Sequence, residues 1–226
     1  MNYHVQQAVL DGGVKICFVT VRGFDNASLP AGWEEERARR IEALRASYAD
    51  LDVKADPVLE GFNLLHDHFG VKRRKNLPAS VNLAKLLVKH GDLAHVNTVV
   101  DLYNIVSLES KLALGAHDLA RIEGDFTLRL TDGTERFVPL GQEEPKPVAA
   151  GEYCYCDDAN EVLCRLEVRQ VNKTAVTQSS RGAAFIVQGN EATSDEYVRG
   201  WADRLGRDIT RVCGGTYCVV VPDVLP

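Results

Sequence analysis

Polar side chains interrupt an otherwise apolar segment at residues 100–122, VDLYNIVSLESKLALGAHDLARI. They are Asp101, Asn104, Ser107, Glu109, His117 and Asp118. Polar groups on a hydrophobic stretch indicate either a satisfied hydrogen-bond network in the core or the wall of a polar pocket. Both interpretations stay open from these residues alone, because Asp101 and Asn104 can also cross-link helices and Asp118 can cap one.

A second group of polar side chains follows at residues 164–180, CRLEVRQVNKTAVTQSS. Its members are Glu167, Arg169, Gln170, Lys173 and Thr174. Groups of these kinds can position a water molecule beside a polar ligand without a nucleophilic side chain. The alternative for Arg169 is an exposed position on a strand. The two segments together are candidates for one pocket with hydrolytic or binding chemistry.

Several familiar motifs are absent, since the sequence contains no P-loop, dinucleotide-binding GxGxxG, HExxH or GxSxG pattern. A covalent mechanism has only distant partners, such as Cys164 with His117. The HDH motif predicts no shared metal site, because His66 and His68 lie on nearly opposite sides of a helix. The cysteines of CYC and CGGTYC lack zinc-ligand spacing. We therefore expect reduced thiols, no metal and no cofactor.

The overall charge argues against a protein whose whole surface grips a polyanion, because the 226 residues carry a formal net charge of −6. A local basic run, Lys72 to Lys75, precedes a helix and is either a nucleic-acid contact or a solvated loop. The apolar runs fall short of a membrane span, and the N-terminus MNYHVQQAVLDGG lacks the pattern of a signal peptide. We expect a cytoplasmic protein without membrane or DNA partners.

The elements that must position these residues follow from the spacing of apolar side chains. Strands are predicted at 5–10 and 14–24, a hairpin around TDGT at 125–140, and further strands at 145–171, 182–189 and 216–224. Helices are predicted at 31–51, 56–70, 77–93, from about residue 98, and at 193–209. Ser80 and Gly91 should bound the third helix, and Thr193 with Glu196 should form a capping box. We expect one α+β domain over residues 1–226.

A resemblance to a known family emerges from blocks in a fixed order. LPAS before a helix, HVNTVVDLYNIVSLES, GAHDLARIEGDFTLRL and DGTERFVPLG resemble the editing domain of the phenylalanyl-tRNA synthetase beta subunit. That domain is built from the third and fourth B modules and is usually called a tRNA-binding domain. The similarity to short free-standing proteins of this kind is greater still. It covers about residues 75–190, with strands and helices before it at 1–74 and a helix and strand after it at 191–226.

The resemblance implies a fold and an activity. The fold is a layer of helices packed on a β-sandwich-like core, and the activity is hydrolysis of the ester that links a wrong amino acid to tRNA. Asn104 stands where the family has a pocket asparagine, and Asp118 matches the end of the family's HAFDL block. Gly115 aligns with the family's pocket histidine, and His117 falls where the synthetase has phenylalanine. Tyr103 replaces a small hydroxyl residue.

The expected function is therefore deacylation of mischarged aminoacyl-tRNA, with no part in making it. Asn104 and His117 would line the site of the water and carbonyl, oriented by Glu109 or Arg169. The substrate would also meet Tyr103, Ser107, Gly115, Asp118, Gln170, Thr174 and Gln188, the last being the nearest candidate for the synthetase glutamate that recognises tyrosine. The run Lys72, Arg73, Arg74 and Lys75 would lie near the acceptor stem. The alternatives are a non-catalytic module that binds tRNA or an amino-acid-like molecule, and a hydrolase of unrelated small esters.

Overall fold

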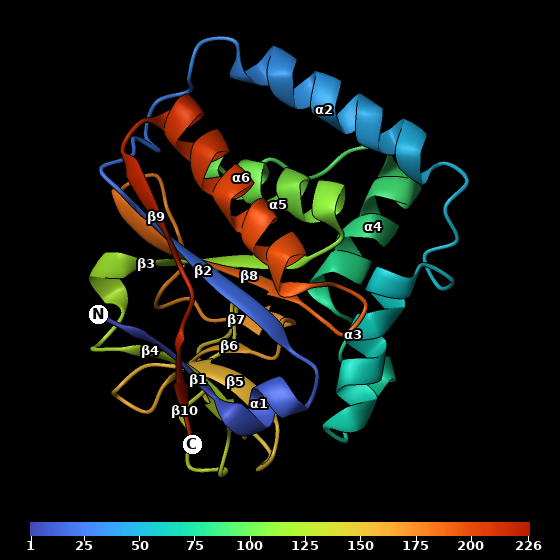
Figure 1. Cartoon of the computed structure of the whole chain (residues 1–226). Coiled ribbons are helices and arrows are strands. Elements are labelled where there is room, and N and C mark those ends of the chain that lie inside the picture. Colours follow the sequence, from blue (N-terminus) through green and yellow to red (C-terminus); the bar gives the residue numbers. More distant parts are fainter.

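Two stacked β-sheets and one layer of helices make up the fold, and the computed structural model describes residues 1–226 throughout (Figure 1). The helices are α1 (Gln7–Asp11), α2 (Trp33–Tyr48), α3 (Pro57–His68), α4 (Ala79–His90), α5 (Thr98–Ser110) and α6 (Asp195–Cys213), with 3₁₀ turns η1 (Arg73–Lys75) and η2 (Leu119–Arg121). The strands are β1 (Tyr3–Gln6), β2 (Lys15–Arg22), β3 (Ala113–Asp118), β4 (Phe126–Leu130), β5 (Tyr153–Cys156), β6 (Val162–Arg165), β7 (Arg169–Gln170), β8 (Gly182–Gly189), β9 (Thr216–Val220) and β10 (Asp223–Leu225). This confirms the predicted α+β class.

The smaller sheet lies in the middle of the molecule. Its strand order is β3-β8-β2-β9, with every neighbouring pair antiparallel. Alternate residues of β2 point to opposite faces, as the pleat of a strand requires. Cys17, Val19 and Val21 belong to the core under the helices, whereas Ile16 and Phe18 belong to the core between the two sheets. The central sheet is therefore buried on both faces.

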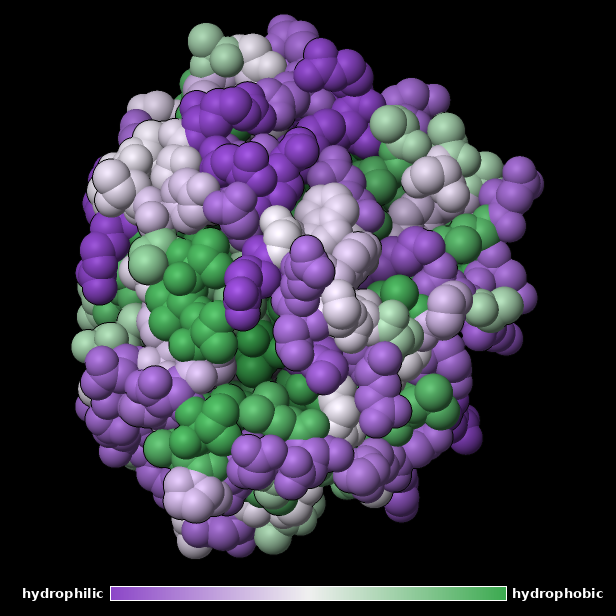
Figure 2. All heavy atoms as spheres, viewed as in Figure 1, coloured by the Kyte–Doolittle hydropathy of each residue, from purple (hydrophilic) through white to green (hydrophobic).

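The larger sheet has the order β10-β1-β4-β5-β6-β7. In it β1 runs parallel to both β4 and β10, and the remaining pairs are antiparallel. Figure 2 shows hydrophobic surface over the region of β9 and β10, where Val221, Val224 and Leu225 are exposed. No helix of the fold combines the length and the apolar character that crossing a membrane would need.

Helix ends agree with the sequence in part. Asp56 caps α3 by accepting hydrogen bonds from two backbone N–H groups, and Gly91 ends α4 in the left-handed conformation. The predicted cap Ser80 lies inside α4 instead, and Pro78 occupies the N-cap position. The Ser80 hydroxyl is buried and has no hydrogen-bond partner. The predicted cap Thr193 donates to the Asn190 carbonyl, 2.8 Å away.

The N-cap of α6 is Ser194, one residue beyond the predicted Thr193, and its side chain accepts from the Tyr197 N–H. The first predicted strand is also shorter than expected. Residues 5–10 divide between the end of β1 and the short helix α1. These corrections shift helix boundaries by one or two residues or convert a strand end into a turn of helix, and they leave the layers unchanged.

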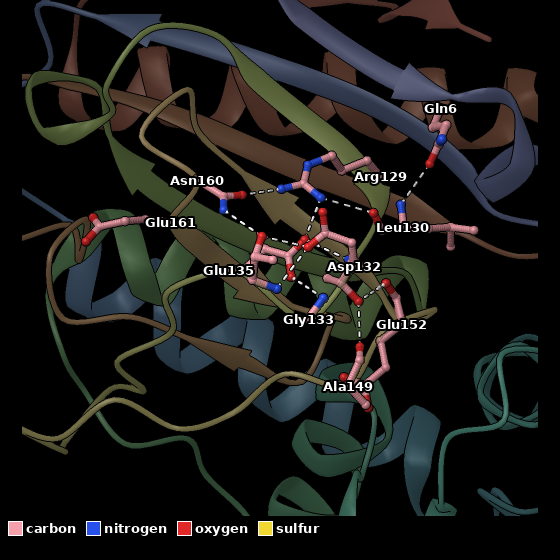
Figure 3. Close-up of polar contacts among 12 residues, drawn as sticks. Gln6, Arg129, Leu130, Asp132, Gly133, Glu135, Ala149, Glu152, Asn160 and Glu161 are labelled. Carbon is pink, nitrogen blue, oxygen red and sulfur yellow. Dashed lines mark hydrogen bonds and ion pairs between the residues drawn. The ribbon is translucent and has the colours of Figure 1, made fainter.

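The predicted hairpin around TDGT does not form, although β4 itself does. Strand β4 pairs with β1 and β5, and the chain after the turn makes only isolated bridges. Figure 3 shows why: the Glu135 carboxylate accepts from the backbone N–H groups of Asp132 and Gly133, each 3.0 Å away, and from the Arg129 guanidinium. These bonds satisfy the backbone N–H groups of Asp132 and Gly133 within the turn, so these groups do not need a paired strand.

Candidate functional site

A cavity of about 520 Å³ opens between the helical layer and the edges of the two sheets. Its walls come from the end of η1 and the segment after it, from α4 and α5, from β3, β5 and β8, from β6, β7 and the turn that joins them, and from Leu140. The lining residues are Lys75, Leu77, Ala79, Asn82, Leu83, Tyr103, Asn104, Ala113, Leu114, Gly115, Leu140, Tyr155, Cys164, Glu167, Val168, Arg169, Gln170 and Ile186. Volume and composition fit a small-molecule site, with mostly apolar walls and a few convergent polar groups.

Five polar side chains of the cavity are free to meet a ligand, because none makes a side-chain hydrogen bond or ion pair within the chain. They are Lys75, Asn82, Asn104, Arg169 and Gln170. Lys75 and Arg169 are exposed, whereas Asn104 and Gln170 are half-buried. The arrangement offers two positive charges and three amides, and each amide can donate and accept hydrogen bonds.

The turn between β6 and β7 brings Glu167, Val168 and Arg169 to the cavity. It begins at Leu166, a non-glycine residue with φ of +54°, and the Val168 N–H donates to the Arg165 carbonyl, 3.2 Å away. A bulky residue in this backbone region costs about 1–3 kcal/mol and persists where the surrounding structure holds it. Leu166 is fully buried in the core between the sheets, and that packing holds the turn in place.

Gly115 of β3 leaves space for the Gln170 side chain at the cavity wall. A Cβ atom at this position would lie 2.4 Å from Nε2 of Gln170. The absence of a side chain therefore lets the Gln170 amide lie close over β3. Gly115 has no left-handed φ, so its requirement here is space for the amide.

A chain of buried hydrogen bonds reaches the cavity at Glu167. Nε2 of His66 lies 2.6 Å from Oε1 of Glu167, and the Tyr153 hydroxyl donates to Oε2. The Gln188 amide donates to the Tyr153 hydroxyl over 3.4 Å, and the Tyr155 hydroxyl donates to the Gln188 carbonyl oxygen. All five side chains are buried. Only Glu167 and Tyr155 of this chain contact the cavity.

The cavity holds no activated nucleophile among its thiol and phenol groups. Burial raises the pKa of Cys164 and of Tyr103 well above the ordinary values of a thiol and a phenol. The pKa of Tyr155 is raised for the same reason. A group whose charged form is disfavoured by desolvation stays protonated at neutral pH. Covalent attack by Cys164 therefore has no support in this geometry.

Six of the residues predicted for the site do come together in the cavity. They are Tyr103, Asn104, Gly115, Arg169, Gln170 and Lys75. Residues 167–170 line the same cavity as Tyr103 and Asn104 of α5. Asn82 and Glu167 complete the polar lining and were not among the predicted site residues. Glu167 had one signal, its place in the polar run at 164–180, whereas the exposed Asn82 of α4 had none.

His117 does not reach the cavity, contrary to the prediction that it lines the site with Asn104. Its Nδ1 lies 2.7 Å from the Thr174 hydroxyl, and its ring packs edge-on against Phe126 between the two sheets. The side chain is fully buried, and Nε2 has no partner. Burial lowers the pKa of His117 to about 3. A neutral imidazole enclosed in this way is part of the packed core between the sheets.

Other predicted residues are also engaged in the fold. The Arg40 guanidinium donates to both oxygens of Glu109, at 2.9 and 2.7 Å, and Glu109 does not line the cavity. The Ser107 hydroxyl donates to the Leu112 carbonyl, 2.6 Å away. Asp118 accepts from the Ala120 N–H at 2.9 Å and from the Ser180 hydroxyl. Thr174 bonds to His117 and Gln188 to the two tyrosines, as described above.

Of the four basic residues at positions 72–75, only Arg73 is neutralised by ion pairs. Arg73 forms ion pairs with Glu60, at 2.7 Å, and with Asp67. Lys72 and Arg74 are exposed without an ion pair, and Lys75 lies at the cavity. The free positive charge at the cavity mouth is therefore that of Lys75 and Arg169.

Groups that could bind a metal are occupied by other partners. The carboxylates of Glu123, Asp157 and Glu161 lie within 4.8 Å of one another. The Lys173 ammonium sits among them, 2.6 Å from Glu123, 3.5 Å from Asp157 and 2.5 Å from Glu161. It supplies the positive charge that a cation would bring. All six cysteines are free thiols.

Comparison with known proteins places these features in a family. A model of the B3/4 domain matches residues 69–206, which include α4, α5, β3 and every polar residue of the cavity. No curated protein matches the chain. Among solved structures, a match is an N-terminal fragment of the phenylalanyl-tRNA synthetase beta subunit from Pyrococcus horikoshii, with a TM-score of 0.49 and 13% sequence identity. The alignment covers 99% of this chain and 51% of that fragment, so the chain spans about half its length. The family match confirms the resemblance seen in the sequence: this chain belongs to the B3/4 domain family.

Proposed function

We propose that this chain is a proofreading hydrolase that acts in trans on tRNA carrying the wrong amino acid. The observation that carries the proposal is the cavity, in which five polar side chains are left without partners inside the protein. Asn104 and Gln170 are half-buried, and polar groups of that kind are normally satisfied, so their convergence with three exposed polar side chains on one cavity favours a ligand. Membership of the B3/4 family supports tRNA as the carrier of that ligand.

The chemistry of the cavity suits an aminoacyl ester. Lys75 and Arg169 at the mouth match the phosphates of the acceptor end. Asn104 and Gln170 further in can hold the ester carbonyl and the amino group, and Ile186 belongs to the apolar wall that would receive the side chain. An aminoacyl ester is already activated, so its hydrolysis needs a positioned water and donors for the developing oxyanion more than a strong nucleophile.

The proposal is tested by incubating the protein with a panel of mischarged tRNAs and measuring the amino acid released. At least one pair should be deacylated well above the buffer rate. Asn104→Ala should lower that rate by about ten- to a thousandfold, the range for losing one oriented contact to the transition state. Asn63→Ala, an asparagine of α3 outside the cavity, is the matched control and should keep the rate. Buffer-level release for every pair would reject the hydrolase.

A second candidate is a module that binds aminoacyl-tRNA or an amino-acid-like molecule without hydrolysing it. It is favoured by one observation, the absence of any histidine or ionised thiol from the cavity wall. In that case charged tRNA should bind more tightly than uncharged tRNA, and the ester should survive in the complex. Measuring affinity and ester lifetime on the same samples separates the two functions.

A further inference from the structure

Glu167 is the only carboxylate among the residues that line the cavity. The other ionisable groups are Lys75 and Arg169, which are cations, and the tyrosines and Cys164, which burial keeps protonated. A protonated phenol or thiol, an ammonium and a guanidinium have no basic site to offer. A carboxylate is acceptor-only and can serve as a general base.

The hydrogen bonds of Tyr155, Gln188 and Tyr153 run in one direction, toward Glu167. Tyr155 donates to Gln188, Gln188 donates to Tyr153, and Tyr153 donates to Oε2 of Glu167. On the other oxygen, Nε2 of His66 lies 2.6 Å from Oε1. Burial holds the pKa of Tyr153 well above its ordinary value, so its hydroxyl remains a donor. A chain of donors that ends on a carboxylate fits the ionised form of that group.

These bonds leave lone pairs of the Glu167 carboxylate unused. An ionised carboxylate has about four lone-pair sites. His66 and Tyr153 use one on each oxygen. Glu167 belongs to the cavity wall, and its side chain is 3% exposed, so a water molecule held at this wall is the donor that can use a remaining site. The two partners also fix the rotamer of Glu167, which is how a base is held ready for a reacting water.

We infer that Glu167 is the general base of the cavity, held in place by His66 and Tyr153, for hydrolysis of the aminoacyl ester. The inference rests on the proposed function. A water molecule bound to Glu167 gives a proton to the carboxylate while its oxygen forms a bond to the ester carbonyl carbon. The ester carbon–oxygen bond then breaks, and the proton passes from Glu167 to the departing ribose oxygen. The products are the free amino acid and uncharged tRNA, with no oxidant, reductant or other reactant required.

His66 is a positioning residue in this scheme and does not contact the substrate. It comes from α3, lies 101 positions before Glu167 in the sequence, and is fully buried. Its Nδ1 has no partner, so either ring nitrogen can carry the proton without breaking another bond. This freedom lets the Glu167→Gln side chain keep a bond to His66 through the other tautomer. The variant should therefore fold.

The experiment compares Glu167→Gln with Glu152→Gln. Glu152 is a matched control because it is similarly buried, at 8% exposure, and pairs with Arg165 at 2.6 Å outside the cavity. Single-turnover deacylation by Glu167→Gln should be about a hundred- to ten-thousandfold slower, the range for losing a general base. KM and binding of a non-hydrolysable aminoacyl-adenosine amide should stay near those of the unmodified protein. Glu152→Gln should lose some thermal stability and keep its rate per folded molecule.

Two further variants exclude a purely structural effect. Glu167→Ala removes the carboxylate and opens space, so added formate should restore part of its rate if a base is what was lost. His66→Gln should lower kcat with KM unchanged and should have no additional effect when combined with Glu167→Gln. Full activity of folded Glu167→Gln would overturn the inference while leaving the proposed hydrolase intact. If the unmodified protein releases no amino acid from any tRNA, the proposed function fails and the inference fails with it.

Discussion

Replacing His117 tests whether this residue belongs to the core or to the cavity. We expect His117→Gln to leave deacylation unchanged and to alter how stability depends on pH. The reason is that burial lowers the pKa of His117 from 6.5 to about 3 in the folded protein. An unfolded chain binds a proton at this residue near its ordinary pKa, while the folded protein does not. Acid therefore favours unfolding.

The magnitude follows from the two pKa values. Stability linked to His117 is complete above the unfolded pKa, falls as the pH drops below about 6.5, and levels off only below about 3. Between roughly pH 7.5 and pH 4.5 the loss amounts to about 2.5 kcal/mol at one pKa unit per 1.4 kcal/mol. Glutamine does not titrate, so this part of the acid destabilisation should disappear in His117→Gln.

The assay is urea unfolding at both pH values for the unmodified protein and the variant, followed by circular dichroism. Carboxylates elsewhere also destabilise the fold in acid, but they do so equally in both proteins, so the difference isolates His117. His90→Gln, at the exposed end of α4, is the matched control for replacing a histidine outside the core. Equal pH dependence in the unmodified protein and His117→Gln would refute the buried neutral imidazole. Loss of deacylation in stable His117→Gln would return this residue to the site.

Three other predictions concern the cavity, its charges and metals. Gly115→Ala should displace the flexible Gln170 amide, raising KM severalfold while costing less than about 1 kcal/mol of stability; a large drop in melting temperature with unchanged KM would contradict this. Lys75→Ala should reduce the slope of log affinity for tRNA against log salt concentration by about 0.7, the value for one phosphate contact of a single strand. Arg73→Ala should leave that slope unchanged, because its charge is already paired with two carboxylates, and equal effects of the two variants would place the RNA surface elsewhere. Exhaustive chelation should change neither melting temperature nor activity, since Lys173 neutralises the acidic cluster; unfolding on chelation would reveal an overlooked metal.

The layers of the fold could be predicted because local patterns there agree with tertiary packing. The apolar stripe of α6, for example, includes Val198, Leu205 and Ile209, and all three are buried on the central sheet. The hairpin prediction failed for a reason that local patterns do not contain. The turn signal at TDGT is real, but Glu135 satisfies the turn's backbone groups, and β4 finds its partners in β1 and β5.

The candidate site was only partly predictable, because no strand was predicted at residues 113–118, where β3 lies, and period-two alternation would not have separated two places on one face. Gly115 and His117 point the same way from β3, yet Gly115 borders the cavity whereas His117 lies under Phe126 between the sheets. The contact between His66 and Glu167 could not be predicted either. It joins residues 101 positions apart, and no spacing rule relates a helix residue to a turn that far along the chain.

The most direct test of the central claim is a single-turnover measurement of labelled amino acid released from mischarged tRNA by the unmodified protein and Asn104→Ala. Asn104 is a half-buried amide of the cavity that has no partner inside the protein, so its loss should affect the ligand more than the fold. We expect release well above the buffer rate for at least one mischarged tRNA, and a rate about ten- to a thousandfold lower for the folded variant. Release at the buffer rate throughout, or equal rates for the two proteins, would contradict it.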